Sequence, residues 1–473
     1  MDMKKQIRMY TVMASLFALA ACAKGESDGD SSGARTPVTI ENQTLYEKGY
    51  ENCDVRVTGS SSLYLSGSVT SVLAGSTVTL EGDDAWLFLP NVSRVKWNLE
   101  KLGKNIFIDG APLADGVNAD VINYYNGVYV KPKAADDYVP ATLYMSDDTP
   151  ADTRLDRIYT GSEIPVGDNR LYRFTLRRGH MMVVAENEDG TGKSKVYMAV
   201  DNDLEQILDT DLQGKISFLR IVPWAYVCKR GIGGDFEMKE AVGITWFYMW
   251  GIGSSASPQM DYAPMFWGSS ASSEANVQKV VADKLTNHIL AFNEPDGEDQ
   301  ADLTPEKAVE LYPLLLRTGL RVGSPACTEG TWKTWLAEFM EGCQERGYRV
   351  DFIATHWYDW GNWSSTNNTD PTDAQIDQMV TRFKKDIDDC YAKYGLPIWI
   401  TEFNANRYRS TDAQVRFLQK AIPMLEANPH VERYAYFQPF GGNGDFLKNG
   451  QLTSVAMAYN SAPSTPAVTG SAD

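Results

Sequence analysis

Two apolar runs that each lead into a glutamate decide the fold of the second half of the chain. Residues 288–296 read HILAFNEPD and residues 397–404 read PIWITEFN. Short runs rich in Ile, Phe and Trp and closed by a polar turn are typical of buried β-strands. Outside them, residues 373–394 carry apolar side chains at helical spacing and stop at Gly395, which predicts an amphipathic helix. The expected strands of this half are residues 216–224, 244–250, 261–267, 288–293, 321–326, 351–357, 397–403 and 433–440.

This alternation of strands and helices predicts an α/β fold. Eight alternations over about 245 residues match the ~250 residues of a (β/α)8 TIM-type barrel, which we assign to residues 216–460. Residues 38–215 instead show short β runs separated by Gly, Asn and Asp, as in the hairpin signal Asn126-Gly127. They predict an all-β domain, either a sandwich or a short β-solenoid, and alternation alone does not separate the two. We expect residues 461–473 to form a disordered tail.

The start of the chain has the pattern of an export signal. Lys4, Lys5 and Arg8 precede the apolar stretch YTVMASLFALAA at residues 10–21, which is shorter than the ~20 residues of a membrane span. The stretch ends in Leu-Ala-Ala-Cys, which resembles a bacterial lipobox and predicts lipidation of Cys22 after removal of the signal. Residues 23–37 would be an acidic, flexible tether. We expect an outer membrane lipoprotein exposed at the cell surface, with a plain secretory signal as the alternative.

Composition excludes several classes of partner. The net charge of −18, from 62 acidic and 44 basic residues, disfavours binding to nucleic acid. The four histidines are far apart in sequence, so we expect no metal site and no cofactor. The membrane would be contacted through the lipid anchor only, and we expect a monomer. No CxxC pair occurs, which predicts buried thiols with at most one or two disulfides of open pairing among Cys53, Cys228, Cys327, Cys343 and Cys390.

Two carboxylates are expected at the same end of the barrel. Glu294 follows the fourth expected strand and Glu402 ends the seventh, and the carboxyl ends of barrel strands share one face. Twelve tryptophans occur in the chain, and ten of them follow residue 215. Glycoside hydrolysis needs a proton-donating carboxylic acid, a second carboxylate, and flat apolar rings that pack against sugars. The alternative is that each glutamate is a buried structural carboxylate paired with an arginine.

The ordered pieces WFYMWG, APMFWG, ILAFNEPD, TPEKA, RVGSPACT, DFIATHWY and LPIWITEFN resemble glycoside hydrolase family 128 over about residues 216–460. This is the glycosyl-hydrolase catalytic core also seen in fungal alkali-sensitive-linkage proteins. The resemblance implies a retaining β-glycosidase that acts on β-1,3-glucans, with Glu294 as acid/base, Glu402 as nucleophile, and Asn293 on the sugar 2-hydroxyl. His356 and Tyr358 are predicted to orient Glu402. Further predicted sugar contacts are the stacking rings Trp250, Trp267 and Trp357 and the polar groups of Tyr436 and Gln438.

The predicted function is therefore a surface-anchored, retaining endo-β-1,3-glucanase acting on a polysaccharide or oligosaccharide. The all-β region would be a spacer or a glycan-binding module. Two alternatives stay open at this point. One is a non-catalytic glycan-binding lipoprotein, and the other is a retaining hydrolase of another neutral or algal polysaccharide.

Overall fold

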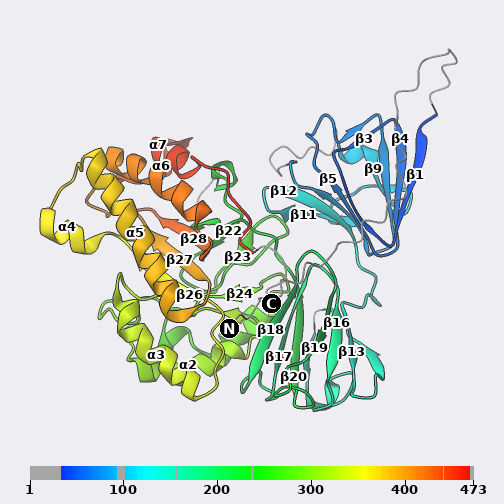
Figure 1. The fold of residues 1–473 in the computed structure, drawn as a ribbon, viewed down its shortest axis with the longest axis horizontal. Helices are drawn as coiled ribbons and strands as arrows, with labels where there is room; N and C mark the ends of the chain where they lie inside the picture. Colours follow the sequence, from blue (N-terminus) through cyan, green and yellow to red (C-terminus); the bar gives the residue numbers. More distant parts are fainter. Residues whose placement is uncertain (1–33, 93–101, 156, 236–238, 440–441, 469–473) are drawn as a thin grey trace, which may run out of the picture.

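The computed structural model describes residues 34–92, 102–155, 157–235, 239–439 and 442–468, which form three packed units (Figure 1). The predicted signal segment, Cys22 and most of the predicted tether lie outside these residues. The described residues include the end of that tether, where Thr36 of β1 pairs with Cys53. No helix in the part of the chain that the structure describes is both long and apolar enough to cross a bilayer.

The first unit is a short β-solenoid, shown in blue and cyan in Figure 1. Its strands return to stack in parallel on the previous coil, and alternate side chains such as Val55 and Val57 point into the apolar interior. One sheet contains β1 (Thr36–Glu41), β4 (Cys53–Thr58), β7 (Thr77–Glu81), β9 (Ile106–Ile108) and β10 (Ala111–Pro112). The other contains β2 (Thr44–Glu47), β5 (Ser61–Leu65), β8 (Ala85–Leu89), β12 (Gly127–Pro132) and β11 (Ala119–Tyr124), and β3 (Tyr50–Glu51) pairs with β6 (Leu73–Ala74).

The second unit, green in Figure 1, is an antiparallel β-sandwich. The region predicted as one all-β domain therefore contains both architectures that the sequence left open. Leu143 and Phe174 of one sheet pack against Val184 and Leu219 of the other in a single core. The sheets are β14 (Pro150–Asp152), β13 (Ala141–Tyr144), β16 (Arg173–Leu176) and β19 (Leu204–Ile207), and β15 (Ile158–Thr160), β20 (Phe218–Pro223), β17 (His180–Ala185) and β18 (Ser194–Ala199).

The prediction that residues 216–224 form the first barrel strand is wrong. It forms β20, which pairs with β15 and β17 inside the sandwich. Leu219 faces the sandwich core, whereas Val222 packs into the apolar cluster of the third unit. Both faces of β20 are buried, and its side chains are apolar except for Arg220, so the strand carries no alternation that would assign it to one unit.

The third unit is a closed ring of eight parallel strands with helices outside it. Two ladders, β23-β22-β21-β28-β27-β26 and β24-β25, join through the parallel bridges Met265–Leu290 and Gly323–Phe352. The first strand is β21, which the sequence analysis missed because its segment RGIG reads as a loop. A Cβ on Gly231 would come within 2.2 Å of the Trp246 indole, so glycine is required there. The strands are β21 (Arg230–Gly233), β22 (Trp246–Tyr248), β23 (Asp261–Tyr262), β24 (His288–Ile289), β25 (Arg321–Val322), β26 (Ile353–Trp357), β27 (Ile398–Phe403) and β28 (Val431–Phe437).

The α/β class is thus as predicted, and the helices follow the later strands. Thr304 caps α2 with Pro305 in its first turn, and α5 ends at Gly395 in the left-handed region with φ 67°. Within the described residues, β21 is followed by a 3-10 helix (Lys239–Val242) and β22 by no helix, so the alternation is incomplete there. The α-helices are α1 (Glu274–Ala282), α2 (Pro305–Leu316), α3 (Trp335–Glu345), α4 (Trp360–Thr366), α5 (Asp373–Tyr394), α6 (Thr411–Ala427) and α7 (Ser454–Tyr459).

Residues 465–467 pack back onto the segment between the sandwich and the ring. The backbone N–H of Lys229 donates to Thr465 O at 2.9 Å, and that of Ala467 donates to Val227 O at 2.9 Å. The prediction of a disordered tail from residue 461 is therefore wrong for residues 461–468. All five cysteines of the described chain are buried free thiols.

Candidate active site

The candidate site lies at the carboxyl ends of the ring strands. β24 leads into Asn293, which bridges in parallel to Ala326, and Glu294 follows directly, while Glu402 lies near the end of β27. A carboxylate oxygen of Glu294, one of Glu402 and a ring nitrogen of His356 all lie within 4.8 Å of one another. The parallel strands thus bring residues more than a hundred positions apart into one cluster.

Glu294 is held in an unusual backbone conformation. Its φ of 40° lies in the left-handed region, while its N–H donates to Ala326 O at 2.7 Å. Such conformations cost energy for residues other than glycine and concentrate at functional sites. The turn presents the half-buried carboxylate to His356, whose Nδ1 is hydrogen-bonded to Glu294 Oε1 at 2.8 Å.

Glu402 is buried and accepts three hydrogen bonds. Oε1 accepts from the Tyr248 hydroxyl at 3.1 Å and from the Trp250 indole N–H at 2.6 Å. Oε2 accepts from the Tyr358 hydroxyl. Burial, followed by the charge of Glu402, raises the pKa of Tyr248 and of Tyr358 well above 10, so both remain donors. Three donors around one carboxylate fix its orientation.

His356 lies fully buried between the two glutamates. Its Nε2 is 3.7 Å from Glu402 Oε1 and has no hydrogen-bond partner among the described residues. Burial lowers the pKa of His356, but the neighbouring carboxylates, Glu402 first, outweigh it, and the net shift is upward. The imidazole therefore couples the charges of the two carboxylates.

Two carboxylates and an imidazole are also the donor types of a metal site. Here, however, both oxygens of Glu402 already accept hydrogen bonds, and His356 Nδ1 is engaged by Glu294. The arrangement favours proton transfer and nucleophilic attack by carboxylates over metal ligation.

The comparisons with known proteins agree with this chemistry. The sequence model of the family described as "Glycosyl hydrolase catalytic core" matches residues 233–459. A family 128 (subgroup I) endo-β-1,3-glucanase of Amycolatopsis mediterranei, solved with laminaritriose, is 31% identical over 49% of this chain and 98% of its own, with a TM-score of 0.43. The C-terminal half of this chain belongs to glycoside hydrolase family 128.

Two further relatives are similar to this family 128 half. A subgroup III curdlan-specific exo-β-1,3-glucanase of Blastomyces gilchristii is 30% identical over 50% of this chain and 98% of its own, with a TM-score of 0.39. Alkali-sensitive linkage protein 1 of Schizosaccharomyces pombe is 29% identical over 265 residues, which are 52% of this chain and 44% of that protein. The chain thus spans less than half the length of this curated relative.

Several predicted residues lie at this candidate site. Besides Glu294, Glu402, His356 and Tyr358, the half-buried Trp250 points its N–H at Glu402, from a backbone with φ 51°. The buried Asn293 donates from Nδ2 to Gln300 at 3.1 Å, while its Oδ1 has no partner within the described residues. Trp267 is half-buried and accepts the Asn293 N–H through its carbonyl, at the same strand end.

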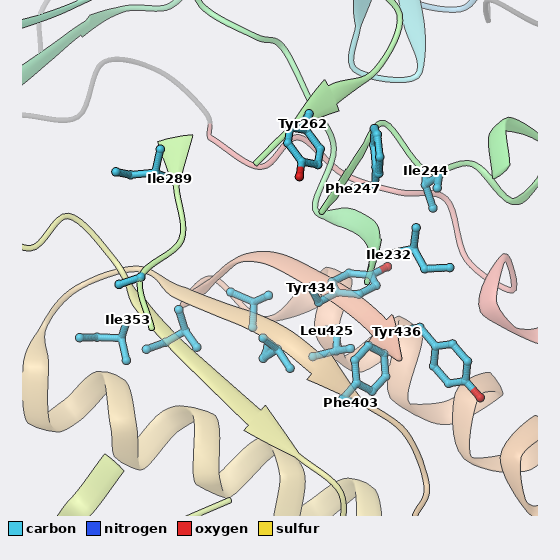
Figure 2. Packing of buried hydrophobic residues seen from close by; sticks show 14 of the residues in the cluster. Ile232, Ile244, Phe247, Tyr262, Ile289, Ile353, Phe403, Leu425, Tyr434 and Tyr436 are labelled. Carbon is cyan, nitrogen blue, oxygen red and sulfur yellow. The ribbon is translucent and has the colours of Figure 1, made fainter. Parts of the chain in front are cut away.

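Two of the predicted sugar contacts, Trp357 and Tyr436, are wrong because both side chains are buried away from the site. Trp357 is 3% exposed and stacks on Phe383 of α5 at 4.4 Å, since residues of a strand alternate and its neighbour His356 already points inward. Tyr436 is fully buried beside Phe403 and stacks on Phe446 at 4.9 Å, on the helix side of β28 (Figure 2). The half-buried Gln438 accepts the Phe446 N–H through Oε1 at 2.7 Å, and its contact with a sugar stays a prediction.

Two site residues were missed by the sequence analysis. Tyr248 precedes Trp250 by two positions, so the strand period of two could have predicted that both face Glu402. Phe437 lies edge-on to Trp250 at 5.5 Å and to Tyr358 at 6.2 Å between ring centroids. Phe437 was not predicted, because the sequence analysis placed its neighbour Tyr436 on the side of β28 that faces the site.

Proposed function

We propose that this protein is a retaining endo-β-1,3-glucanase in which Glu294 is the acid/base and Glu402 the nucleophile. The observation that carries the proposal is that the two side chains have carboxylate oxygens within 4.8 Å of each other. Retaining glycosidases hold their carboxyl groups about 5–5.5 Å apart, whereas inverting enzymes need about 6.5–9.5 Å to admit a water molecule. The short separation supports direct attack by Glu402 on the sugar.

The reaction would proceed in two displacements. Glu402 attacks the anomeric carbon while Glu294 gives its proton to the departing glycosidic oxygen, which leaves a covalent glycosyl–enzyme. Glu294, now ionised, takes a proton from water, the hydroxide oxygen bonds to the anomeric carbon, and Glu402 leaves. Tyr248, Trp250 and Tyr358 hold the Glu402 carboxylate in place for both steps.

The surroundings of the glutamates suit a neutral sugar ring. Asn293 Oδ1, buried and without a partner among the described residues, could accept from the sugar 2-hydroxyl. Trp250, Trp267 and Phe437 offer apolar ring surface at the same strand ends. The β-1,3-glucan specificity rests on the relatives named above, which include both endo- and exo-acting enzymes.

We also propose that the protein acts at the cell surface, anchored through lipid on Cys22. The support is the signal-like residues 1–22 and the acidic residues that follow. Metabolic labelling with a fatty acid should mark the wild type but not Cys22→Ser, and protease added to intact cells should cleave the wild type. A labelled Cys22→Ser protein, or full protection from protease, would contradict this part.

The catalytic proposal is tested on laminarin and curdlan. Glu402→Gln and Glu294→Gln should lose reducing-end release, whereas Glu298→Gln, an exposed glutamate four residues after Glu294, should stay active. Proton NMR of the first product should show the β-anomer. With azide, Glu402→Ala should form an α-glycosyl azide and Glu294→Ala a β-glycosyl azide.

Three results would refute the assignment. A first product in the α-configuration would exclude retention. Glycan binding by the wild type without bond cleavage would indicate the non-catalytic alternative. Cleavage confined to another polysaccharide in a panel of neutral and algal glycans would overturn the substrate.

A further inference from the structure

A cavity lies outside the ring, where the solenoid meets the sandwich. Its volume is about 540 Å³, within the range of small-molecule sites. Its walls come from the ends of β2, β5 and β11 and from the loop that follows β18. The lining residues are Tyr46, Glu47, Lys48, Tyr64, Ser66, Pro90, Tyr124 and Asp201.

An aromatic stack forms one wall of this cavity. Tyr46, Tyr64 and Phe88 occupy matching positions on the parallel strands β2, β5 and β8. Their rings stack at 4.6 Å between Tyr46 and Tyr64 and at 4.3 Å between Tyr64 and Phe88, with interplanar angles of 17° and 7°. Since β2 is the last strand of its sheet, the stack ends at Tyr46, and this residue is 67% exposed.

The open ring is already ordered before any ligand arrives. Tyr64 and Phe88 behind it are buried, so Tyr46 rests on a fixed support. A ring held in this way loses little conformational entropy on binding, and a flat apolar partner would continue the stack by one layer.

The polar wall faces the same space. The structure gives the Asp201 side chain no hydrogen bond or ion pair with any described residue, and burial raises the pKa of its carboxyl. The Tyr64 and Tyr124 rings lie edge to face with their centroids 6.0 Å apart, and burial and the charge of Asp201 raise the pKa of both and of Tyr46. A partly desolvated carboxylate gains most from a ligand that donates hydroxyl hydrogens.

The position of Asp201 is fixed by contacts between the units. The Tyr226 hydroxyl, from the segment that leads into the ring, donates to Val200 O just before Asp201. On the sandwich side, Arg178 donates to Ser61 O at 3.0 Å and lies 4.4 Å from the Trp86 ring centroid of the solenoid. The cavity is therefore a feature of the packed units, with both walls held in place.

We propose that this cavity is a second carbohydrate site, in which one ring of a neutral glycan chain stacks on Tyr46 and donates hydroxyl hydrogens to Asp201. Sugars combine a flat apolar face with a rim of hydroxyl groups, which matches one ring wall and one acceptor wall. The ionisable groups of the lining are Glu47, Asp201 and Lys48 besides the tyrosines, and the whole chain carries −18, so polyanions are disfavoured. That the glycan is β-1,3-glucan rests on the proposed function, whereas the site itself does not.

The test uses the full chain with Glu402→Gln, so that no substrate is consumed. Binding to insoluble curdlan, cellulose, xylan and mannan, and to the polyanion alginate, is measured by depletion from solution for this parent and for added Tyr46→Ala, Tyr46→Phe and Asp201→Asn. Tyr144→Ala, at a half-buried tyrosine of the sandwich, is the matched control. Melting temperatures verify that each variant folds.

We expect Tyr46→Ala to weaken binding of at least one neutral glycan about 2- to 10-fold, the range for loss of one ring contact. Tyr46→Phe and Tyr144→Ala should bind like the parent, and Asp201→Asn should bind more weakly. Equal binding of every neutral glycan by parent and Tyr46→Ala would overturn the proposal, as would a Tyr46 effect on alginate alone. If Tyr46→Ala weakens binding of a neutral glycan while the wild type cleaves no glucan, the proposed function is refuted and the proposed second site is supported.

Discussion

Removing the indole N–H of Trp250 should slow catalysis without changing the fold. In Trp250→Phe the aromatic surface facing Phe437 is largely kept, but the 2.6 Å hydrogen bond to Glu402 Oε1 is lost. A hydrogen bond to a charged group is worth about 1.5–3 kcal/mol, which corresponds to about 10- to 150-fold in rate. Tyr248 and Tyr358 still hold the carboxylate, so we expect the lower part of that range in kcat/KM.

The assay is steady-state hydrolysis of laminarihexaose by purified wild type and variant, with kcat and KM determined separately. The loss should fall mainly on kcat, because the N–H bonds the nucleophile and not the substrate. Trp360→Phe is the matched control, since this half-buried tryptophan of α4 packs against Tyr408 and, within the described part of the chain, makes no hydrogen bond to Glu402. If folded Trp250→Phe keeps its kcat/KM within a factor of about two, the bond does not position the nucleophile.

Three further predictions concern stability. Because the pKa of His356 is raised in the folded protein, its charge stabilises the fold below the ordinary pKa near 6.5, and this stabilisation is lost as pH rises through the folded pKa. The difference in melting temperature between wild type and His356→Asn should therefore be largest in acid and shrink above neutrality. A difference that does not change with pH would contradict this. Trp357→Ala should cost about 3–5 kcal/mol of unfolding free energy in denaturant titrations and leave KM for laminarihexaose unchanged, whereas a raised KM with full stability would restore the stacking role. Gly179→Ala should lower the melting temperature more than Gly450→Ala. Both glycines have positive φ (69° and 73°), but only a Cβ at Gly179 would meet Trp86, at 2.8 Å. Equal losses would mean that the Trp86 side chain moves aside at no cost.

The sequence could predict that Glu294 and Glu402 lie close together because the signal is local. Glu294 and Glu402 each follow a short apolar run, and the closed ring of parallel strands brings such ends together whatever the loops do. The side chains around them depend on which alternate residues of a strand face inward. His356 and Trp357 are consecutive, so they could not both face the site, and the same holds for Tyr436 and Phe437.

The N-terminal half could not be resolved because its decisive contacts are distant in sequence. Alternating strands such as β4 and β16 look alike, yet β4 pairs in parallel with β1 and β7, whereas β16 pairs in antiparallel with β13 and β19. Which pairing forms depends on coil-to-coil stacking that no single segment encodes. The same reasoning explains β21, where Gly231 makes room for the Trp246 indole and does not form a turn.

The three units are joined by packed contacts rather than by a flexible linker, and this bears on how the two proposed sugar sites would cooperate. Trp224, Tyr226 and Cys228, in the segment between sandwich and ring, are at most 4% exposed. Tyr226 also packs edge-on against Phe88 at 6.4 Å, in the stack that ends at Tyr46. A glycan held at Tyr46 would therefore reach the ring from a fixed distance. The second site would raise the effective concentration of substrate only for glycan chains long enough to span the two sites. Polymers long enough to bridge that span would gain from the second site, and short oligosaccharides would not.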